Sequence, residues 1–299
     1  MKTILPYLSC ALAESPIWDD RQQILYWVDI TLGILHAFTP DTSQHKSWHF
    51  REKISCIGLS EGEEILVAGK SGIWRFNPQD GQRMLWAKFP PHSQLMRPNE
   101  GKIGPDGAFW VSTMEDQEKR GPNGKLYRFA IDGSAKCMIN GLVTPNGLDW
   151  SPDGSNMYIA ETRALYVTRW SFDIHTGSLH NPQPFLMLRE NQGKPDGACV
   201  DREGNYWLCG IYSGSVQVYS PKGNLLKRIE VGTNMVTMPC FGGRELDTLF
   251  VTSLTRGNNS PGSVRYMRIA GVQGRQPHRI KLLAAWPSKM HKLNAECHS

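Results

Sequence analysis

The chain of 299 residues lacks any apolar run long enough to cross a membrane as a helix, because such a helix needs about 20 consecutive, mainly apolar residues. It also lacks the apolar stripe with a period of about 3.6 residues, closed by caps, that is typical of long amphipathic helices. These two absences predict a protein that has no membrane partner and whose regular secondary structure consists of strands.

Paired cysteine motifs are absent as well. The seven cysteines are odd in number, include no C-x-x-C pair and lie partly in apolar runs, which indicates reduced core thiols instead of a disulfide framework or a zinc site. The opening segment M-K-T-I-L-P-Y-L-S-C-A-L-A resembles a secretion signal. However, it carries one Lys, a Pro interrupts it, and its removal would leave Glu14 at the new terminus. We therefore expect a cytoplasmic protein.

Charge is nearly balanced except at the C-terminal end. Residues 263–299 contain seven Lys and Arg against Glu296 alone, within a net charge of +5. A basic stretch can bind nucleic acid, but this one has neither interleaved aromatic residues nor a recognition motif. We interpret it as a solvated edge strand and tail, and we expect no nucleic-acid partner.

A repeat runs through the chain. Six short aromatic or β-branched runs recur at intervals of 40 to 49 residues, the length expected for four-stranded propeller blades. Asp-Gly pairs between them are typical of tight hairpin turns. The residues that mark the runs are Tyr26, Leu66, Trp110, Tyr158, Trp207 and Phe250. The pattern predicts an all-β, six-bladed β-propeller; a β-sandwich or two small β domains would not explain six nearly equal units without a linker.

A propeller needs a closed ring. Residues 1–13 contain short apolar runs, and residues 280–286 form a late one. We expect an N-terminal strand to join the last blade, because this pairing removes two free sheet edges. The predicted organisation is a single propeller over residues 1–286, followed by a C-terminal tail over 287–299.

Four oxygen-bearing side chains occupy the same phase of the repeat, each 11 or 12 residues before an apolar strand. They are Glu14, Asn99, Asn146 and Asp196. Arranged around an axis, these side chains would converge on a central metal site. Carboxylate and amide oxygens without His or Cys suit Ca²⁺, Mg²⁺ or Mn²⁺ better than structural zinc. P-N-G and P-D-G are also common turn sequences, but four polar groups in phase favour a metal site.

An ordered set of motifs covers most of the chain, from about Ala13 to Ala270. The motifs are E-S-P-I-W-D, L-Y-W-V-D-I, R-P-N-E-G-K, F-W-V-S-T-M, P-N-G-L-D-W-S-P-D-G, P-D-G-A, C-F-G-G and L-F-V-T-S. Each motif is weak alone, but together they resemble the gluconolactonase/regucalcin family (senescence-marker-protein and luciferin-regenerating-enzyme-like proteins) of sugar lactone hydrolases.

The resemblance implies a propeller with one divalent cation, Ca²⁺, Mg²⁺, Mn²⁺ or Zn²⁺, in its central tunnel. It implies Glu14, Asn146 and Asp196 as ligands, Asp196 also as catalytic base, and Arg97 and Asn99 as residues that hold substrate oxygens. The expected activity is metal-dependent hydrolysis of a small-molecule sugar (aldonic acid) lactone to the open-chain sugar acid.

Three departures from the family pattern bear on the substrate. Glu100 stands where the family usually has Asp, which would reposition its hydrogen bonds. Gln117 occupies the place of an acidic substrate contact, and Arg163 replaces an uncharged residue. The two last changes make the pocket less negative and predict tolerance of an anionic group, such as a sulfonate or phosphate, on the lactone. An exposed Arg163 without a role is the alternative.

Two other functions remain open from the sequence. A metal-dependent phosphotriesterase would use the same kind of site, since a phosphoryl oxygen can replace a lactone carbonyl. A non-catalytic calcium-binding propeller is the third possibility, although an incomplete ligand shell favours an enzyme. The sequence determines neither the sugar, nor the metal, nor the oligomeric state.

Overall fold

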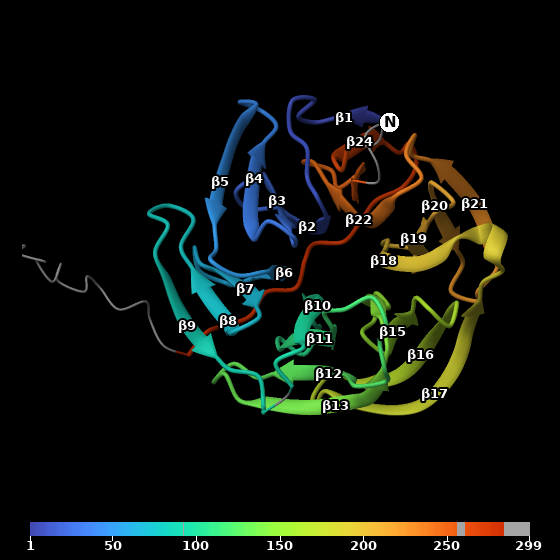
Figure 1. Ribbon diagram of the computed structural model, residues 1–299. Coiled ribbons are helices and arrows are strands. Elements are labelled where there is room, and N and C mark those ends of the chain that lie inside the picture. Colours follow the sequence, from blue (N-terminus) through green and yellow to red (C-terminus); the bar gives the residue numbers. More distant parts are fainter. Residues whose placement is uncertain (92, 256–260, 284–299) are drawn as a thin grey trace, which may run out of the picture.

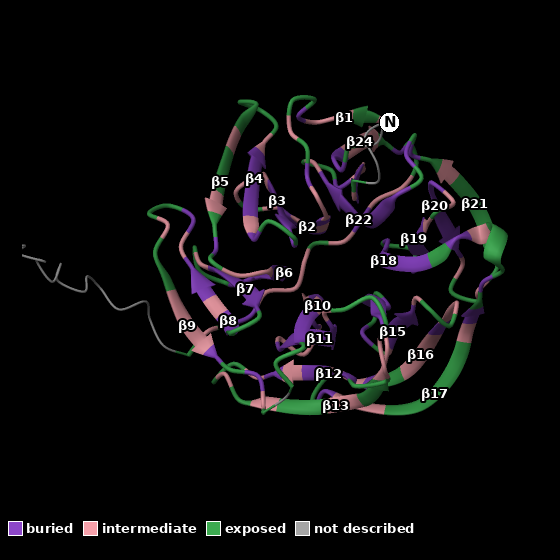
Figure 2. Ribbon diagram, in the orientation of Figure 1, coloured by how far each residue is buried: buried purple, intermediate pink, exposed green. Residues whose placement is uncertain are grey.

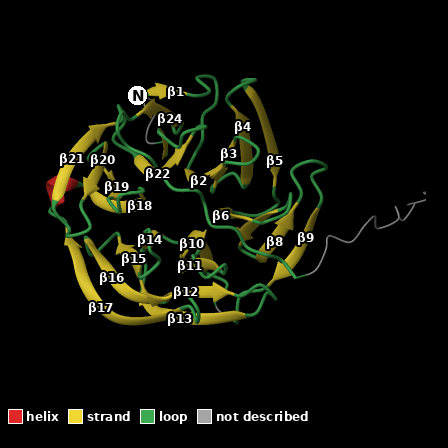
Figure 3. Cartoon of the chain, turned by 180° about the vertical axis from the view of Figure 1, so that it is seen from behind, coloured by secondary structure: helices red, strands yellow, loops and turns green. Residues whose placement is uncertain are grey.

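Six four-stranded antiparallel sheets surround a central axis in the computed structural model, which describes residues 1–91, 93–255 and 261–283 (Figure 1). This arrangement confirms the predicted six-bladed propeller. The only helical element in those ranges is one 3-10 turn, Glu190–Gln192, and no described helix is long and apolar enough to span a membrane. Figure 3 shows the same predominance of strands from behind.

We number the blades 1 to 6 in chain order, with the strands of each blade running from the axis outward. Blade 1 contains β2 (Ala13–Asp19), β3 (Ile24–Asp29), β4 (Ile34–Thr39) and β5 (Gln44–His49). Blade 2 contains β6 (Ile54–Leu59), β7 (Ile65–Gly69), β8 (Gly72–Phe76) and β9 (Arg83–Ala87). Blade 3 contains β10 (Met96–Ile103), β11 (Phe109–Glu115), β12 (Gly124–Phe129) and β13 (Ala135–Leu142).

The second half of the ring repeats this order. Blade 4 contains β14 (Pro145–Trp150), β15 (Asn156–Glu161), β16 (Tyr166–Asp173) and β17 (Ser178–Met187). Blade 5 contains β18 (Lys194–Val200), β19 (Tyr206–Ile211), β20 (Ser215–Tyr219) and β21 (Leu225–Glu230). Blade 6 contains β22 (Val236–Gly242), β23 (Thr248–Ser253), β24 (Val264–Arg268) and β1 (Lys2–Thr3).

The core lies between the blades. Inner strands are buried and the outermost strands are largely exposed (Figure 2), as expected when each sheet packs only on its two neighbours. All six residues that mark the sequence repeat are at most 3% exposed. Trp110 of blade 3, for example, packs edge-on against Trp150 of blade 4 at 5.9 Å between ring centroids. Such an aromatic contact stabilises the fold beyond the burial of apolar area alone.

Ring closure follows the sequence prediction. β1 pairs with β24, Lys2 opposite Tyr266, so the first strand of the chain completes the last blade. The described cysteines Cys10, Cys56, Cys137, Cys199, Cys209 and Cys240 are free, and five of them are buried. This agrees with the reduced core thiols predicted from their number and spacing.

The C-terminal stretch departs from its prediction. Residues 273–283 leave blade 6 and cross the end of the tunnel (Figure 1) to reach blade 2, where Ile280 bridges to Ser60. We call residues 273–283 the strap. Two of its basic residues are ion-paired: Arg275 with Asp149 at 3.1 Å, and Arg279 with Asp19 at 2.7 Å.

The interpretation of this basic stretch as a solvated edge strand and tail is therefore wrong for Arg275 and Arg279, because each guanidinium is held by carboxylates of other blades. Arg268 of β24 is solvated as expected, with a side chain that is 76% exposed, but β24 is not an edge strand because β1 pairs with its outer side. The predicted boundary between propeller and tail at 286/287 lies outside the described residues.

A buried histidine predicts sensitivity to acid. His36 is 3% exposed, stacks on Trp27 at 4.9 Å between ring centroids, and contacts His45. Burial lowers its pKa from 6.5 to about 3, so the fold accommodates the neutral ring. Its contribution is complete above pH 6.5 and is lost as the pH falls toward 3, because the unfolded chain then binds the extra proton. Relative to His36→Phe, wild type should lose up to about 1.4 kcal/mol of unfolding free energy per pH unit between pH 6 and 4.

Denaturant unfolding at several pH values measures this difference. His175 is exposed, so His175→Phe should keep the pH slope of wild type. Parallel slopes for wild type and His36→Phe would show that His36 does not titrate with folding.

Candidate metal and substrate site

The same backbone irregularity occurs in the innermost strand of every blade. A β-bulge leaves one residue unpaired and re-aims the side chains beside it. The six register shifts lie between Glu14 and Ile17, Ile54 and Cys56, Pro98 and Gly101, Asn146 and Asp149, Pro195 and Ala198, and Val236 and Pro239. All four oxygen-bearing residues singled out from the sequence lie at these bulges, so their common phase has a structural cause.

Two of these side chains are acids that interact strongly. Burial raises the pKa of Glu14 to about 7, and burial together with the charge of Glu14 raises that of Asp196 well above its ordinary value. Asp196 is 7% exposed. Glu14 accepts a hydrogen bond from the Ser15 amide at 3.0 Å. Arg97 is the cation that favours the ionised form of both acids.

A chain of hydrogen bonds links the remaining candidates. Arg97 Nη1 donates to Asn99 Oδ1 at 2.9 Å, and Asn99 Nδ2 donates to Asn146 Oδ1 at 2.8 Å. Asn146 Nδ2 donates in turn to Thr162 Oγ1 at 2.8 Å. The Asn146 amide is therefore held from both ends, and one lone pair of its oxygen remains for another partner.

Two glycines allow this close packing. Gly147 has φ +62°, and a Cβ there would lie 2.3 Å from the Tyr206 hydroxyl oxygen. A Cβ on Gly197 would lie 2.5 Å from the Met238 side chain. The P-N-G and P-D-G sequences therefore lie at bulges inside β14 and β18 and not in turns between strands, and the role of Asn146 and Asp196 as metal ligands remains a prediction.

A third acid, Glu100, lies close enough to Glu14 and Asp196 for their charges to interact. Its Oε1 accepts from the Leu148 amide at 3.0 Å, whereas Oε2 is buried without a hydrogen-bond partner among the described residues. Burial raises its pKa well above the ordinary value, and Lys102 opposes that shift. The Glu100 side chain thus reaches across to blade 4, and the repositioning of its hydrogen bonds relative to Asp remains a prediction.

This donor set fits a divalent cation. Two carboxylates that disfavour each other's ionisation, a fixed amide oxygen and an orphaned buried oxygen form a site with an excess of acceptors. Within the described ranges, no three His, Cys, Asp or Glu side chains gather as a metal cluster. A cation here therefore depends on the Asn146 amide and on water or substrate to complete its shell.

Cationic side chains lie beside this cluster. Asp116 pairs with Lys53 at 2.8 Å and with the buried Arg97 at 3.3 Å. Burial raises the Asp116 pKa, but Lys53, Arg97 and the nearby Lys70 lower it overall. Arg97 is thus oriented by an acid that the sequence interpretation did not single out. Asp116 adjoins Gln117 in M-E-D-Q, and that adjacency was the one available signal.

The two residues predicted to set substrate charge lie at the surface. Gln117 and Arg163 are both exposed. The Gln117 amide donates to Glu115 Oε2 at 3.1 Å, and Arg163 donates to the backbone oxygen of Glu118. Neither contacts Glu14, Asn146 or Asp196 through an observed hydrogen bond, so their roles toward substrate remain predictions. Arg120, which the sequence interpretation did not single out, is half-buried, and its burial together with the charges of nearby Arg97 and Arg163 lowers its pKa.

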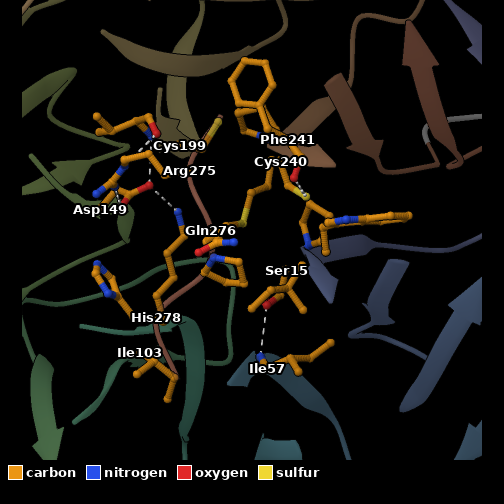
Figure 4. A pocket seen from close by; sticks show the side chains of 18 of the residues that line it. Ser15, Ile57, Ile103, Asp149, Cys199, Cys240, Phe241, Arg275, Gln276 and His278 are labelled. Atoms are coloured by element: carbon orange, nitrogen blue, oxygen red, sulfur yellow. Dashed lines mark hydrogen bonds and ion pairs between the residues drawn. The ribbon is translucent and has the colours of Figure 1, made fainter. Parts of the chain in front are cut away.

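The opposite end of the tunnel is lined differently. A cavity of about 100 Å³ lies under the strap (Figure 4). Arg275 and Asp149 face each other across one side of it, and His278 of the strap lies below them. Asp149 lies near the end of β14, whereas Asn146 lies near its start. The candidate site and this cavity therefore belong to opposite ends of the inner strands.

Known proteins match over most of the chain. The family described as "SMP-30/Gluconolactonase/LRE-like region" matches residues 12–255. The 6-deoxy-6-sulfogluconolactonase of Pseudomonas putida is 35% identical, with 83% of this chain and 85% of that protein covered. Pentonolactonase XacC of Haloferax volcanii is 32% identical, with 85% of each covered. The structure of regucalcin from Agrobacterium tumefaciens, described as a calcium-binding protein, has a TM-score of 0.89 at 25% identity and covers 94% of this chain and 98% of that one.

Proposed function

The chain belongs to the SMP-30/gluconolactonase/LRE-like family, and from this premise we propose that it hydrolyses a sugar lactone to the open-chain sugar acid with the help of one divalent cation. The observation that carries the proposal is the interacting pair of acids, half-buried Glu14 and buried Asp196, on which the charge of Arg97 acts. Arg97 is linked in turn through Asn99 to the amide of Asn146. The lactonase names of two relatives support the reaction class.

Glu14, Asn146 and Asp196 would hold the cation. The donors are all oxygen, which favours Ca²⁺, Mg²⁺ or Mn²⁺ over Zn²⁺. A cation bound there supplies polarisation of the lactone carbonyl and stabilisation of the negative charge that develops on its oxygen, an effect worth several kcal/mol.

The protein's own groups handle the proton and the substrate. Hydrolysis forms a bond between water oxygen and the carbonyl carbon, breaks the bond from that carbon to the ring oxygen, and moves one proton from water to the ring oxygen. Asp196 would accept this proton and return it. Arg97 is already oriented by Asp116 and Asn99, so its remaining donors reach substrate hydroxyls without reorganisation.

The finer part of the proposal is that the lactone carries an anionic group. Gln117 in place of an acid and the cations around Asp116 support it. So does the relative named 6-deoxy-6-sulfogluconolactonase.

A lactone panel with and without chelator tests the reaction. Purified protein should open aldonolactones to the acid, lose this activity in chelator, and regain it with Ca²⁺, Mg²⁺ or Mn²⁺. The spontaneous opening rate in buffer is the control. Hydrolysis of an organophosphate triester but of no lactone would favour the phosphotriesterase reading. Calcium binding without turnover of either substrate would favour the calcium-binding propeller named in the regucalcin relative.

A further inference from the structure

We propose that Arg120 receives the anionic group of the substrate, a sulfonate or phosphate on the end of the sugar that lies away from the lactone carbonyl. This inference rests on the proposed lactonase function and assigns the residue that would determine its specificity. It starts from the charged groups of the connection between β11 and β12.

The two acids at the start of the connection between β11 and β12, Glu115 and Asp116, are already engaged. The Asp116 carboxylate accepts hydrogen bonds from Lys53 at 2.8 and 2.9 Å and pairs with Arg97. The Glu115 carboxylate accepts from the Gly121 amide at 2.7 Å and the Asn123 side chain at 2.7 Å. In contrast, none of the ion pairs within the described ranges includes Arg120, Arg163 or Lys70. The guanidinium of Arg120 is therefore left without an ion-pair partner among the described residues.

Arg120 is the best anchored of these unpaired cations. Its Nε donates to two backbone oxygens, of Glu115 at 3.1 Å and of Gln117 at 2.9 Å. Its Nη1 donates to Thr144 Oγ1 at 3.3 Å, and no hydrogen bond of Nη2 to a described residue is present. Three fixed contacts hold the plane of the guanidinium and leave one edge for a ligand, whereas Arg163 and Lys70 are exposed.

Thr144 ties Arg120 to the candidate metal centre. This residue is 6% exposed, its amide donates to Glu161 Oε1 at 2.7 Å, and it lies two positions before Asn146. Partial burial and the charges of Arg97 and Arg163 lower the Arg120 pKa, although Asp116 and Glu115 oppose the shift, and these effects indicate that the three guanidinium groups lie near one another. A bound anion would relieve this repulsion, and an oxyanion accepts paired hydrogen bonds from a guanidinium edge.

Specificity constants for paired substrates test this assignment. The substrates are gluconolactone and its analogues with a sulfonate, phosphate or carboxylate at the terminal carbon. In Arg120→Gln, the ratio of kcat/KM for the sulfonate or phosphate analogue to that for gluconolactone should fall at least about 10-fold, mainly through KM, because a hydrogen bond to a charged group is lost. Arg120→Lys should restore part of the ratio, and the matched control Lys119→Gln, in the same exposed turn, should leave it at the wild-type value.

The outcomes separate the two proposals. Equal losses on neutral and charged lactones would mean that Arg120 only supports the fold and would overturn the inference. A selective loss in Arg163→Gln but not in Arg120→Gln would move the anion to Arg163 and also overturn it. Preference for the carboxylate analogue alone would overturn the choice of sulfonate or phosphate.

Absence of all lactone turnover would refute the proposed function instead. In that case, calorimetric binding of the open-chain sulfonated and phosphorylated sugar acids decides the inference: weaker binding to Arg120→Gln than to wild type supports it, and equal binding overturns it.

Discussion

Replacing Asp196 with Asn should lower kcat at least about 100-fold at saturating metal. The substitution keeps an oxygen that can face the cation but removes the group that accepts the proton of the attacking water. Asp196 lies at the bulge of β18, where the neighbouring Gly197 has no room for a side chain. Asn has nearly the same size and shape as Asp, so it should fit there without a shift of the backbone. Steady-state kinetics on the best lactone of the panel, with metal content determined by elemental analysis, measure the effect.

The surface variant Asp132→Asn is the control for this experiment, because Asp132 is exposed in a turn of blade 3. Its kcat should equal that of wild type. If Asp196→Asn binds metal fully and turns over near the wild-type rate, Asp196 does not act as the base.

Replacing Glu14 with Gln should weaken divalent metal binding at least about 100-fold, since one of two negative ligands is lost. Activity should vanish at limiting metal and return in part at high concentrations. Titration calorimetry gives the affinity directly, without reference to turnover.

Glu14→Gln should be more stable toward unfolding than wild type when metal is absent, although it binds metal less well. Burial raises the folded-state pKa of Glu14 from 4.5 to about 7. Its ionisation therefore costs folding free energy as the pH rises from 4.5 through 7, and the cost stays above that range. In chelator at pH 8, Glu14→Gln should unfold at a higher temperature than wild type, whereas with saturating metal the order should reverse. Wild type more stable in both conditions would contradict a metal role for Glu14.

The blades could be predicted from sequence because their signal is local. Each repeat carries its own buried aromatic or aliphatic residue and its own hairpin turns, so Tyr26 and Trp207 report on their blades independently. The strap could not be predicted in this way. Arg275 and Arg279 pair with acids 126 and 260 positions earlier in the chain, and an isolated basic residue gives no indication of so distant a partner.

The candidate site shows the same division. Glu14, Asn146 and Asp196 shared a phase that the bulges explain. Arg120 had no such phase, because it lies in the connection between β11 and β12 and its position depends on backbone oxygens of its own turn. The role of Asp116 in orienting Arg97 likewise could not be predicted, because it depends on contacts between side chains that are distant in the sequence.

The closure by β1 has a consequence for how the protein is made. Lys2 and Thr3 of β1 leave the ribosome long before their partners Tyr266 and Arg265, and the strap that ties blade 6 to blades 1, 2 and 4 comes later still. Blades 1 to 5 each consist of one continuous segment and can form as they emerge. The nascent chain must carry an unpaired strand until almost all of the ring exists, so the slow step is the final long-range docking of its two ends.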